Sequence, residues 1–121
     1  KKGQKGRALA SHAAMIEQIR QYVKQNYSAA LSLSSLADFV YTNPSYLSRI
    51  FKEETGTALS AYINKIRIIH ARQMLIDTDE LIIDIAIACG YNYIPHFNKV
   101  FREFTGMTPT AYRKTYKKPS F

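Results

Sequence analysis

This chain has few of the residues and motifs that mark secreted, membrane or enzymatic proteins. Its one cysteine, Cys89, has no partner for a disulfide within the chain, so nothing requires an oxidising compartment. The apolar segment around Cys89 predicts a small core residue rather than a nucleophile. No apolar run approaches the roughly 18 residues of a membrane span, and no apolar segment follows the basic N-terminus as it would in a signal peptide. We therefore expect a cytoplasmic protein with no membrane partner.

Metal-binding and catalytic patterns are missing as well. The three histidines, His12, His70 and His96, are scattered without metal-ligand spacing. The chain has no nucleophile elbow, no phosphate-cradling glycine loop and no obvious pair of carboxylates. The sequence therefore predicts a protein that is not an enzyme, with no catalytic residue, metal site or cofactor.

The net charge of +8 comes mostly from the two ends of the chain. Between Ala8 and Arg113, ten Lys and Arg stand against nine Asp and Glu, a net charge of only +1. The distribution is more informative than the total. Four acidic residues lie within residues 77–84, whereas basic residues lie on the outward sides of two predicted helices. Charge sorted by face in this way indicates a side that binds DNA.

Hydrophobic periodicity predicts an all-α chain. Apolar residues recur at helical spacing in seven segments, and none shows strand alternation strong enough to overrule a helix. Ser32 or Ser34 can cap the second helix, and Asn43 the third. Residues 1–11 are polar and without period, as in a linker or a tag remnant. The expected helices span about 12–27, 33–40, 44–55, 61–76, 81–89, 94–105 and 109–115.

Two of these helices, 44–55 and 94–105, have one apolar and one polar side. Each has a proline in its first turn, where a missing N–H costs nothing, and a following glycine suited to a left-handed cap. The apolar sides consist of Leu47, Ile50, Phe51 and Thr55 in the first and Phe97, Val100, Phe101 and Phe104 in the second. The polar sides consist of Ser45, Ser48, Arg49 and Lys52 in the first and Pro95, Asn98, Lys99 and Arg102 in the second. A helix whose outward side carries hydroxyl, amide and cationic groups suits the major groove of DNA.

The two helices belong to an internal repeat of about 50 residues. When LSSLADFVYTNPSYLSRIFKEETGTALSAY is aligned with IIDIAIACGYNYIPHFNKVFREFTGMTPTAY, Ala37 matches Ala86 at an offset of 49. Phe51 matches Phe101 at an offset of 50, which implies a one-residue insertion in the turn between the short helix and the next. Each unit thus has the parts of a helix-turn-helix, with a small alanine where the second helix must approach closely.

The turn differs between the two copies. Gly90 offers the positive φ that such a turn favours. Tyr41 takes its place in the first copy, a departure that must cost stability or imply a different turn.

The helix expected at 61–76 joins the two units. Its sixteen residues span roughly 24 Å at ~1.5 Å rise per residue. With the width of the packed units added, the two recognition helices would lie ~34 Å apart, which is one turn of DNA. We therefore expect a DNA-binding domain over 12–121, composed of a first helix-turn-helix unit at 12–59, a linker helix at 60–77 and a second unit at 78–116. Both units are expected to offer their polar sides in the same direction.

These segments resemble the DNA-binding domain of the AraC/XylS family of bacterial transcription regulators. The resemblance covers about residues 15–115 and rests on LSLSSLA, SYLSRIFKEETG, YINKIRIIHARQML, IIDIAIACGY and FNKVFREFTGMTPTAYR. The run NPSYLSRIFKEETG is similar to versions at the C-terminus of some response regulators of Gram-positive bacteria. The resemblance implies seven helices in two homeodomain-like helix-turn-helix subdomains, joined by a long linker helix. It also implies an N-terminal sensing or receiver domain that this chain lacks, and RNA polymerase as a partner of the parent protein.

The resemblance and the polar sides together predict sequence-specific binding to a double-stranded DNA operator. Arg49 is the first candidate for base reading, because an arginine bidentate to guanine is the commonest specific contact. The alternative for Arg49 is a surface pair with Glu53, four residues further on. The full base-reading set is Ser45, Ser48, Arg49, Pro95, Asn98 and Lys99. The expected phosphate-binding set is Lys52, Arg102 and Arg113, the last with a structural salt bridge as the alternative.

A second hypothesis for the whole chain is a helical-repeat module for protein–protein interaction, which also fits a ~50-residue period. Two units are few for such a stack, and its groove need not be basic. A steep fall of DNA affinity with salt would separate the two hypotheses. In either case we expect Arg67 and Arg72, on the linker helix, to be solvated or paired with acids of the neighbouring unit.

Overall fold

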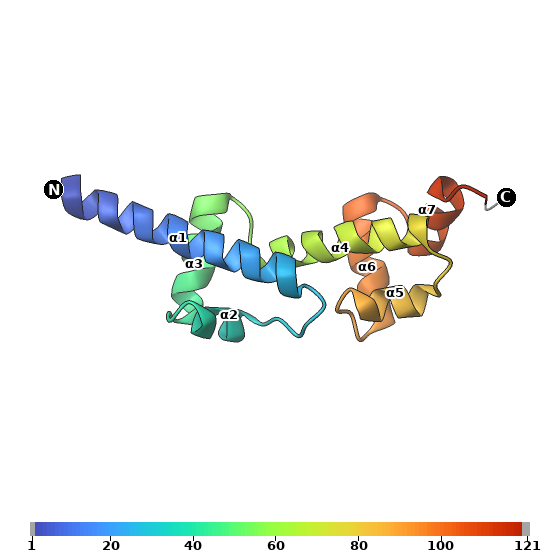
Figure 1. Ribbon diagram of the computed structural model, residues 1–121, viewed down its shortest axis with the longest axis horizontal. Helices are drawn as coiled ribbons and strands as arrows, with labels where there is room; N and C mark the ends of the chain where they lie inside the picture. The colour runs from blue at the N-terminus through green and yellow to red at the C-terminus, as the bar shows by residue number, and fades with distance from the viewer. Residues whose placement is uncertain (1, 120–121) are drawn as a thin grey trace. The chain divides into compact units, whose positions relative to one another are not determined.

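This computed structural model describes residues 2–119, with side chains from Ser11 onward. That part of the chain contains seven α-helices and no strand. Figure 1 shows their order along the chain. The all-α prediction is confirmed, and the predicted helices agree with the observed ones to within two residues except at the start of the first. The helices are α1 (Lys2–Asn26), α2 (Leu33–Phe39), α3 (Pro44–Thr55), α4 (Leu59–Asp77), α5 (Ile82–Ala88), α6 (Ile94–Thr105) and α7 (Pro109–Tyr116).

The first helix begins much earlier than the apolar period predicts. The backbone of the segment expected to be a linker or tag remnant continues α1 from Lys2, while Lys1 lies outside the described residues. Lysine, glutamine, arginine, alanine and leucine are good helix formers, so they can extend a helix that is anchored further along. A search for apolar periodicity alone misses such an extension.

The helices pack into two compact units. Unit 1 consists of α1, α2, α3 and the start of α4 through Ile63. Unit 2 consists of α4 from Asn64 onward with α5, α6 and α7, and it also includes Tyr27–Ala29 from the connection after α1. Residues of α4 therefore contribute to both units.

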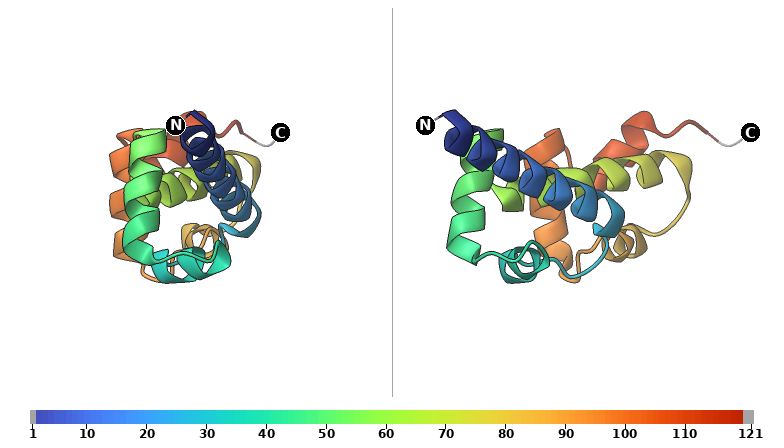
Figure 2. Two further views of the ribbon diagram at one scale, coloured as in Figure 1. Left: turned by 90° about the vertical axis from the view of Figure 1, so that its left-hand side faces the viewer. Right: turned by 60° about the vertical axis from the view of Figure 1, so that its left-hand side comes forward.

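In unit 1, α2 runs across the beginning of α3, and α1 packs against α3, as the views in Figure 2 show. Ala37, the small residue of α2 expected where α3 approaches closely, is fully buried. The Phe51 and Tyr62 rings lie 5.6 Å apart between centroids in this core. The buried side chains of unit 1 are Ile16, Ile19, Val23, Leu36, Ala37, Leu47, Ile50, Phe51, Leu59 and Ile63.

Unit 2 repeats this packing with a more aromatic core. Phe97 and Phe101 of α6 are fully buried, with ring centroids 5.8 Å apart, and Phe101 meets Tyr112 of α7 edge-on at 5.4 Å. Ala86 is buried at the position equivalent to Ala37. The buried cluster consists of Ile68, Ala71, Leu75, Ile85, Ala86, Cys89, Tyr91, Phe97, Val100, Phe101 and Tyr112. The prediction that Cys89 is a core residue is confirmed.

The predicted insertion falls where expected. Four residues separate α2 from α3, whereas five separate α5 from α6. Of the two serines proposed as the cap of α2, Ser32 holds that position, and its side chain accepts a hydrogen bond from the backbone N–H of Ser35. The prediction of Asn43 as the cap of α3 is also confirmed.

Phe104 was expected on the apolar side of α6, but it is 45% exposed, so that prediction is wrong. The residue is in phase with Phe97 and Phe101 but lies in the last turn of α6. Periodicity gives the direction of a side chain, whereas burial also requires a neighbouring element that extends as far as that turn. Thr55, also expected inward, is half-buried, and its hydroxyl donates to the Phe51 carbonyl at 2.7 Å.

Arg67 is a structural residue of unit 2, contrary to the expectation of a solvated or acid-paired side chain. Its Nε donates to the Tyr27 carbonyl and its Nη2 to the Ala29 carbonyl, each at 2.8 Å. The guanidinium carbon lies 5.3 Å from the centroid of the Tyr91 ring. Arg72 is exposed, as expected, and its Nε also donates to the Tyr112 hydroxyl at 3.1 Å. The hydrogen bonds of Arg67 and Arg72 join residues 38 to 40 positions apart, and local sequence patterns do not show contacts over such a separation.

Candidate nucleic-acid interface

The polar side of α3 is set by the burial of its opposite side. Leu47, Ile50 and Phe51 are buried in unit 1, which fixes the rotation of the helix about its axis. The start of the helix is fixed by Asn43, whose Oδ1 accepts a hydrogen bond from the Tyr46 N–H at 2.8 Å, and by Pro44 in the first turn. The helix stops at Gly56, which has the left-handed φ of 76°. The four residues predicted on the outward side are all exposed: Ser45, Ser48, Arg49 and Lys52.

Arg49 forms the surface pair that was the alternative to base reading. Its Nη1 lies 3.4 Å from Glu53 Oε1, and the two side chains are 58% and 56% exposed. An exposed pair of this kind contributes only about 0.2–1 kcal/mol, because water and salt screen it. The pair therefore leaves the guanidinium free to exchange Glu53 for another acceptor.

The polar side of α6 is built in the same way. Phe97, Val100 and Phe101 are buried in unit 2, and Gly106 ends the helix at a φ of 78°. The start differs, because Tyr93 at the cap position gives no side-chain hydrogen bond. The four residues predicted on this side are also exposed: Pro95, Asn98, Lys99 and Arg102.

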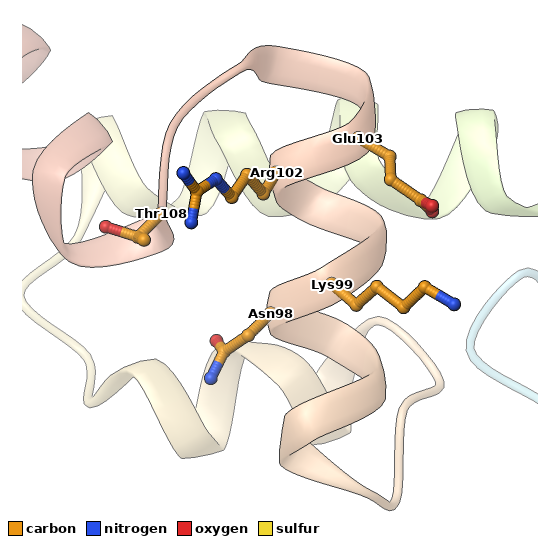
Figure 3. A pocket seen from close by; sticks show the side chains of 5 residues that line it. All are labelled: Asn98, Lys99, Arg102, Glu103 and Thr108. Carbon is orange, nitrogen blue, oxygen red and sulfur yellow. The ribbon is translucent and has the colours of Figure 1, made fainter.

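A hollow of about 520 Å³ lies between α6 and the start of α7. Figure 3 shows that Asn98 and Arg102 point from α6 toward Thr108, the residue that caps α7, whereas Lys99 and Glu103 point to the other side of α6. An amide, a guanidinium and a hydroxyl are thus gathered on one side of the helix, and an ammonium and a carboxylate lie on the other. All of these groups except the Glu103 carboxylate can donate hydrogen bonds to base edges and phosphate oxygens.

Unit 1 has a smaller hollow beside α3 and the start of α4, about 180 Å³. Ser48 lines it where Asn98 lines the hollow of unit 2, and Ala58 takes the place of Thr108. The remaining lining is mostly apolar, with Leu31, Leu33 and Ile63 among its residues. The two units therefore offer different chemistry beside their outward helices.

Arg113, predicted to bind phosphate, has a structural role instead. Its Nε donates to the Leu75 carbonyl at 3.0 Å, its Nη1 to the Glu80 carbonyl at 2.7 Å and its Nη2 to the Thr78 carbonyl at 3.1 Å. All three nitrogens of the guanidinium are therefore occupied by the end of α4 and the connection after it. The structural alternative was a salt bridge, but the partners are backbone carbonyls. The residues still expected to bind phosphate are Lys52 and Arg102.

Two residues beside the polar sides were not predicted. Thr108 lines the hollow of unit 2, and Tyr46 lies beneath Arg49, whose guanidinium carbon is 5.3 Å from the ring centroid. The spacing of Tyr46 and Arg49, three residues apart on a helix, is a sequence signal for this contact. Thr108 has no such signal, since its place beside α6 depends on the path of the chain between α6 and α7.

A metal centre and a membrane span have no counterpart in the described part of the chain. Among the described side chains, residues 11–119, no three His, Cys, Asp or Glu gather as a metal would require. No helix within residues 2–119 combines the length and the apolar character needed to cross a membrane.

Comparison with known proteins gives one consistent result. The helix-turn-helix domain family matches residues 36–115. The bifunctional transcriptional activator and DNA repair enzyme AdaA of Bacillus subtilis is 36% identical over 102 residues, which cover 84% of this chain and 48% of AdaA. This chain thus spans about half the length of that relative.

Solved structures agree with this match. The C-terminal domain of AraT, a response regulator from Geobacillus stearothermophilus, is 32% identical with a TM-score of 0.84, covering 88% of this chain and 89% of that domain. A transcriptional regulator with an AraC-type DNA-binding domain from Chromobacterium violaceum is 30% identical with a TM-score of 0.78, covering 92% of this chain and 99% of the other.

Proposed function

The chain belongs to the AraC/XylS family of bacterial transcription regulators as a DNA-binding domain, and from that premise we propose how it binds DNA. We infer that α3 and α6 are the two recognition helices and that they enter successive segments of the major groove of one operator. The observation that carries this proposal is the exposure of all eight predicted outward residues on two helices whose opposite sides are buried. The helical-repeat interaction module finds no support in the comparisons.

Arg49 reads guanine in this proposal, and Asn98 reads adenine. Arginine matches guanine O6 and N7, and asparagine matches adenine N6 and N7, in bidentate geometry. Lys99 donates to guanine or to a phosphate, Ser45 and Ser48 donate to bases or phosphates, and Pro95 makes an apolar contact at the start of α6. Lys52 and Arg102 lie further along their helices and bind phosphates.

The proposed domain extends over 12–121, with the two units joined through α4. Tandem helix-turn-helix units on one chain take the place of a dimer of single-unit proteins. The two half-sites are then expected about one helical turn of DNA apart, ~34 Å. DNase footprinting that shows protection on one face over two adjacent major-groove segments supports this arrangement, and protection of a single segment contradicts it.

The whole protein is proposed to carry a sensing or receiver domain in addition to this domain, and to act on RNA polymerase in the cytoplasm. The supporting observation is the likeness to the C-terminal domain of a response regulator.

The decisive experiment starts by selecting a binding site from a pool of random duplexes with this chain. Affinity for the selected duplex and for a shuffled duplex is then measured over a range of salt concentrations. Arg49→Ala should cost about 1–3 kcal/mol on the selected duplex and little on the shuffled one. An equal loss on both duplexes contradicts base reading by Arg49.

Lys52→Ala and Arg102→Ala provide the phosphate test. Each should weaken both duplexes to a similar extent and reduce the slope of log K against log salt by about 1. Arg113→Ala is the matched control, because its guanidinium is engaged by backbone carbonyls, and the variant should leave the salt slope unchanged. A slope that does not change with Lys52 or Arg102 contradicts their assignment to phosphates.

A further inference from the structure

Arg49 is held above an aromatic ring of its own helix. Its guanidinium carbon lies 5.3 Å from the centroid of the Tyr46 ring, one turn earlier on α3. A cation over a ring face is attracted by the ring quadrupole. This contact is not a hydrogen bond, so it occupies none of the guanidinium N–H donors, and the exposed Glu53 carboxylate is the acceptor that a guanine would replace.

The Tyr46 ring is in turn fixed by α1. Its hydroxyl oxygen lies 2.6 Å from His12 Nε2, within hydrogen-bond distance, and the two rings meet edge-on with centroids 5.9 Å apart. The other ring nitrogen of His12, Nδ1, lies 3.8 Å from Glu54 Oε1 near the end of α3. His12 of α1 thus contacts Tyr46 near the start of α3 and Glu54 near its end. Its side chain is only 24% exposed.

The backbone of Tyr46 is also fixed, since its N–H donates to the side chain of the cap residue Asn43. Both ends of the Tyr46 residue are therefore held, the main chain by the helix cap and the hydroxyl by His12. Arginine is a long side chain with much rotamer freedom, and ordering it on DNA costs binding free energy. A ring that already restricts the guanidinium reduces that cost.

Unit 2 lacks this arrangement. His96, Lys99 and Phe104 take the places of Tyr46, Arg49 and Glu54. The His96 ring lies edge-on against Tyr91, with centroids 5.5 Å apart. Among the described side chains, no cation–π contact involves Lys99.

We propose that Tyr46 and His12 are positioning residues for base reading by Arg49, so that α1 contributes to specificity without touching DNA. This inference rests on the proposed function, since it needs Arg49 to read a base. It makes unit 1 the more discriminating half of the domain, because among the described side chains a reading cation lies over an aromatic ring in unit 1 and not in unit 2.

The test uses a double-mutant cycle on discrimination, defined as the affinity for the selected duplex divided by the affinity for the same duplex with the guanine opposite Arg49 replaced. Tyr46→Leu should lower discrimination about three- to tenfold, the range expected for loss of a partly shielded cation–π contact. In an Arg49→Ala background the same change should have no further effect. His96→Leu, at the equivalent place in unit 2, is the matched control and should leave discrimination at this base unchanged.

Two milder variants separate positioning from folding. Tyr46→Phe keeps the ring and removes the hydroxyl, and His12→Gln removes the partner of that hydroxyl; each should lower discrimination about two- to threefold, and the two effects should not add. Urea unfolding of each variant verifies that it is folded under the binding conditions. The positioning role is overturned if Tyr46→Leu lowers discrimination equally in the presence and in the absence of Arg49. It is also overturned if the effects of Tyr46→Phe and His12→Gln on discrimination add.

The outcomes also distinguish this inference from the proposal on which it rests. If Arg49→Ala leaves discrimination unchanged, base reading by Arg49 fails and nothing remains to be positioned. If Arg49→Ala abolishes discrimination while Tyr46→Leu, Tyr46→Phe and His12→Gln retain it in full, the positioning role alone is wrong.

Discussion

Tyr41 and Gly90 occupy equivalent positions in the turns of the two helix-turn-helix units, and both have a positive φ, 58° and 99°. In each unit the next residue donates its N–H to the carbonyl of the buried alanine, from Thr42 to Ala37 and from Tyr91 to Ala86, both at 2.9 Å. The first copy thus keeps the same turn with a residue that is unsuited to it. Of the two outcomes that the sequence left open, a cost in stability or a different turn, the structure shows the same turn.

Replacing Tyr41 by glycine should therefore stabilise the protein. An L-residue in the left-handed region costs about 1–2 kcal/mol, and part of the gain is offset by the greater backbone freedom of glycine in the unfolded chain, leaving about 0.5–1 kcal/mol. Tyr41 is 97% exposed, so few contacts are lost. Urea unfolding of Tyr41→Gly measures the gain, with Tyr41→Ala as the control that keeps a β-carbon. If both variants have the same stability, the backbone strain at Tyr41 is negligible.

Gly90→Ala should have the opposite effect, and a larger one. A β-carbon at Gly90 would lie 2.8 Å from the Tyr27 carbonyl oxygen and 2.9 Å from Arg67 Nε, in addition to the unfavourable φ. Gly106→Ala is the matched control, because a β-carbon there meets nothing within 4 Å at a φ of 78°. We expect a loss of about 1–2 kcal/mol for Gly106→Ala and at least ~1 kcal/mol more for Gly90→Ala in urea unfolding. Equal losses of stability for the two variants would show that the connection after α1 can shift to accommodate a β-carbon at Gly90 without a further loss of stability.

The two phenylalanines at the end of α6 should differ sharply in their contribution to stability. Phe101 is fully buried, so Phe101→Ala should lower the free energy of unfolding by about 3–5 kcal/mol, as should Phe51→Ala in unit 1. Phe104 is 45% exposed, so Phe104→Ala should cost less than about 1 kcal/mol. Thermal or urea unfolding compares the three variants. A large loss at Phe104 would contradict its exposed position.

Stability should fall at high pH because of the buried phenol of Tyr91. Burial raises the pKa of Tyr91 to about 12, and the nearby Arg67 cation opposes this shift only in part. The pKa of the unfolded chain is about 10, so between pH 10 and 12 the unfolded state loses a proton that the folded state keeps. The contribution of Tyr91 is thus fully present below pH 10 and is lost as the pH rises through 12.

The expected loss from Tyr91 is about 2–3 kcal/mol across that range. Burial also raises the pKa of the Cys89 thiol to about 11, with the same sign, so the measurement is best made in a Cys89→Ala background. Urea unfolding at pH 9, 10 and 11 should give a decline that is steeper with Tyr91 than with Tyr91→Phe. Parallel curves for the two proteins would contradict the raised pKa of Tyr91.

Local patterns in the sequence were sufficient to predict the parts of the candidate interface. The prolines and glycines that bound α3 and α6, the cap at Asn43 and the burial of Phe97 and Phe101 depend on residues within one or two turns of each other. The exposure of Arg49 and Asn98 follows from the same periodicity, because a helix that buries one side must leave the other outward. Which bases these residues contact stays a prediction.

The sequence by itself determined the seven helices, the duplication and the direction in which each recognition helix turns its polar side, since all of these arise from spacing along the chain. Only the tertiary structure decided that Arg67 and Arg113 serve backbone carbonyls, that Phe104 is exposed and that His12 reaches Tyr46. The hydrogen-bond partners of Arg67, Arg113 and His12 lie 33 to 40 positions away along the chain. Contacts over such separations depend on how the connections fold back, which no local periodicity specifies.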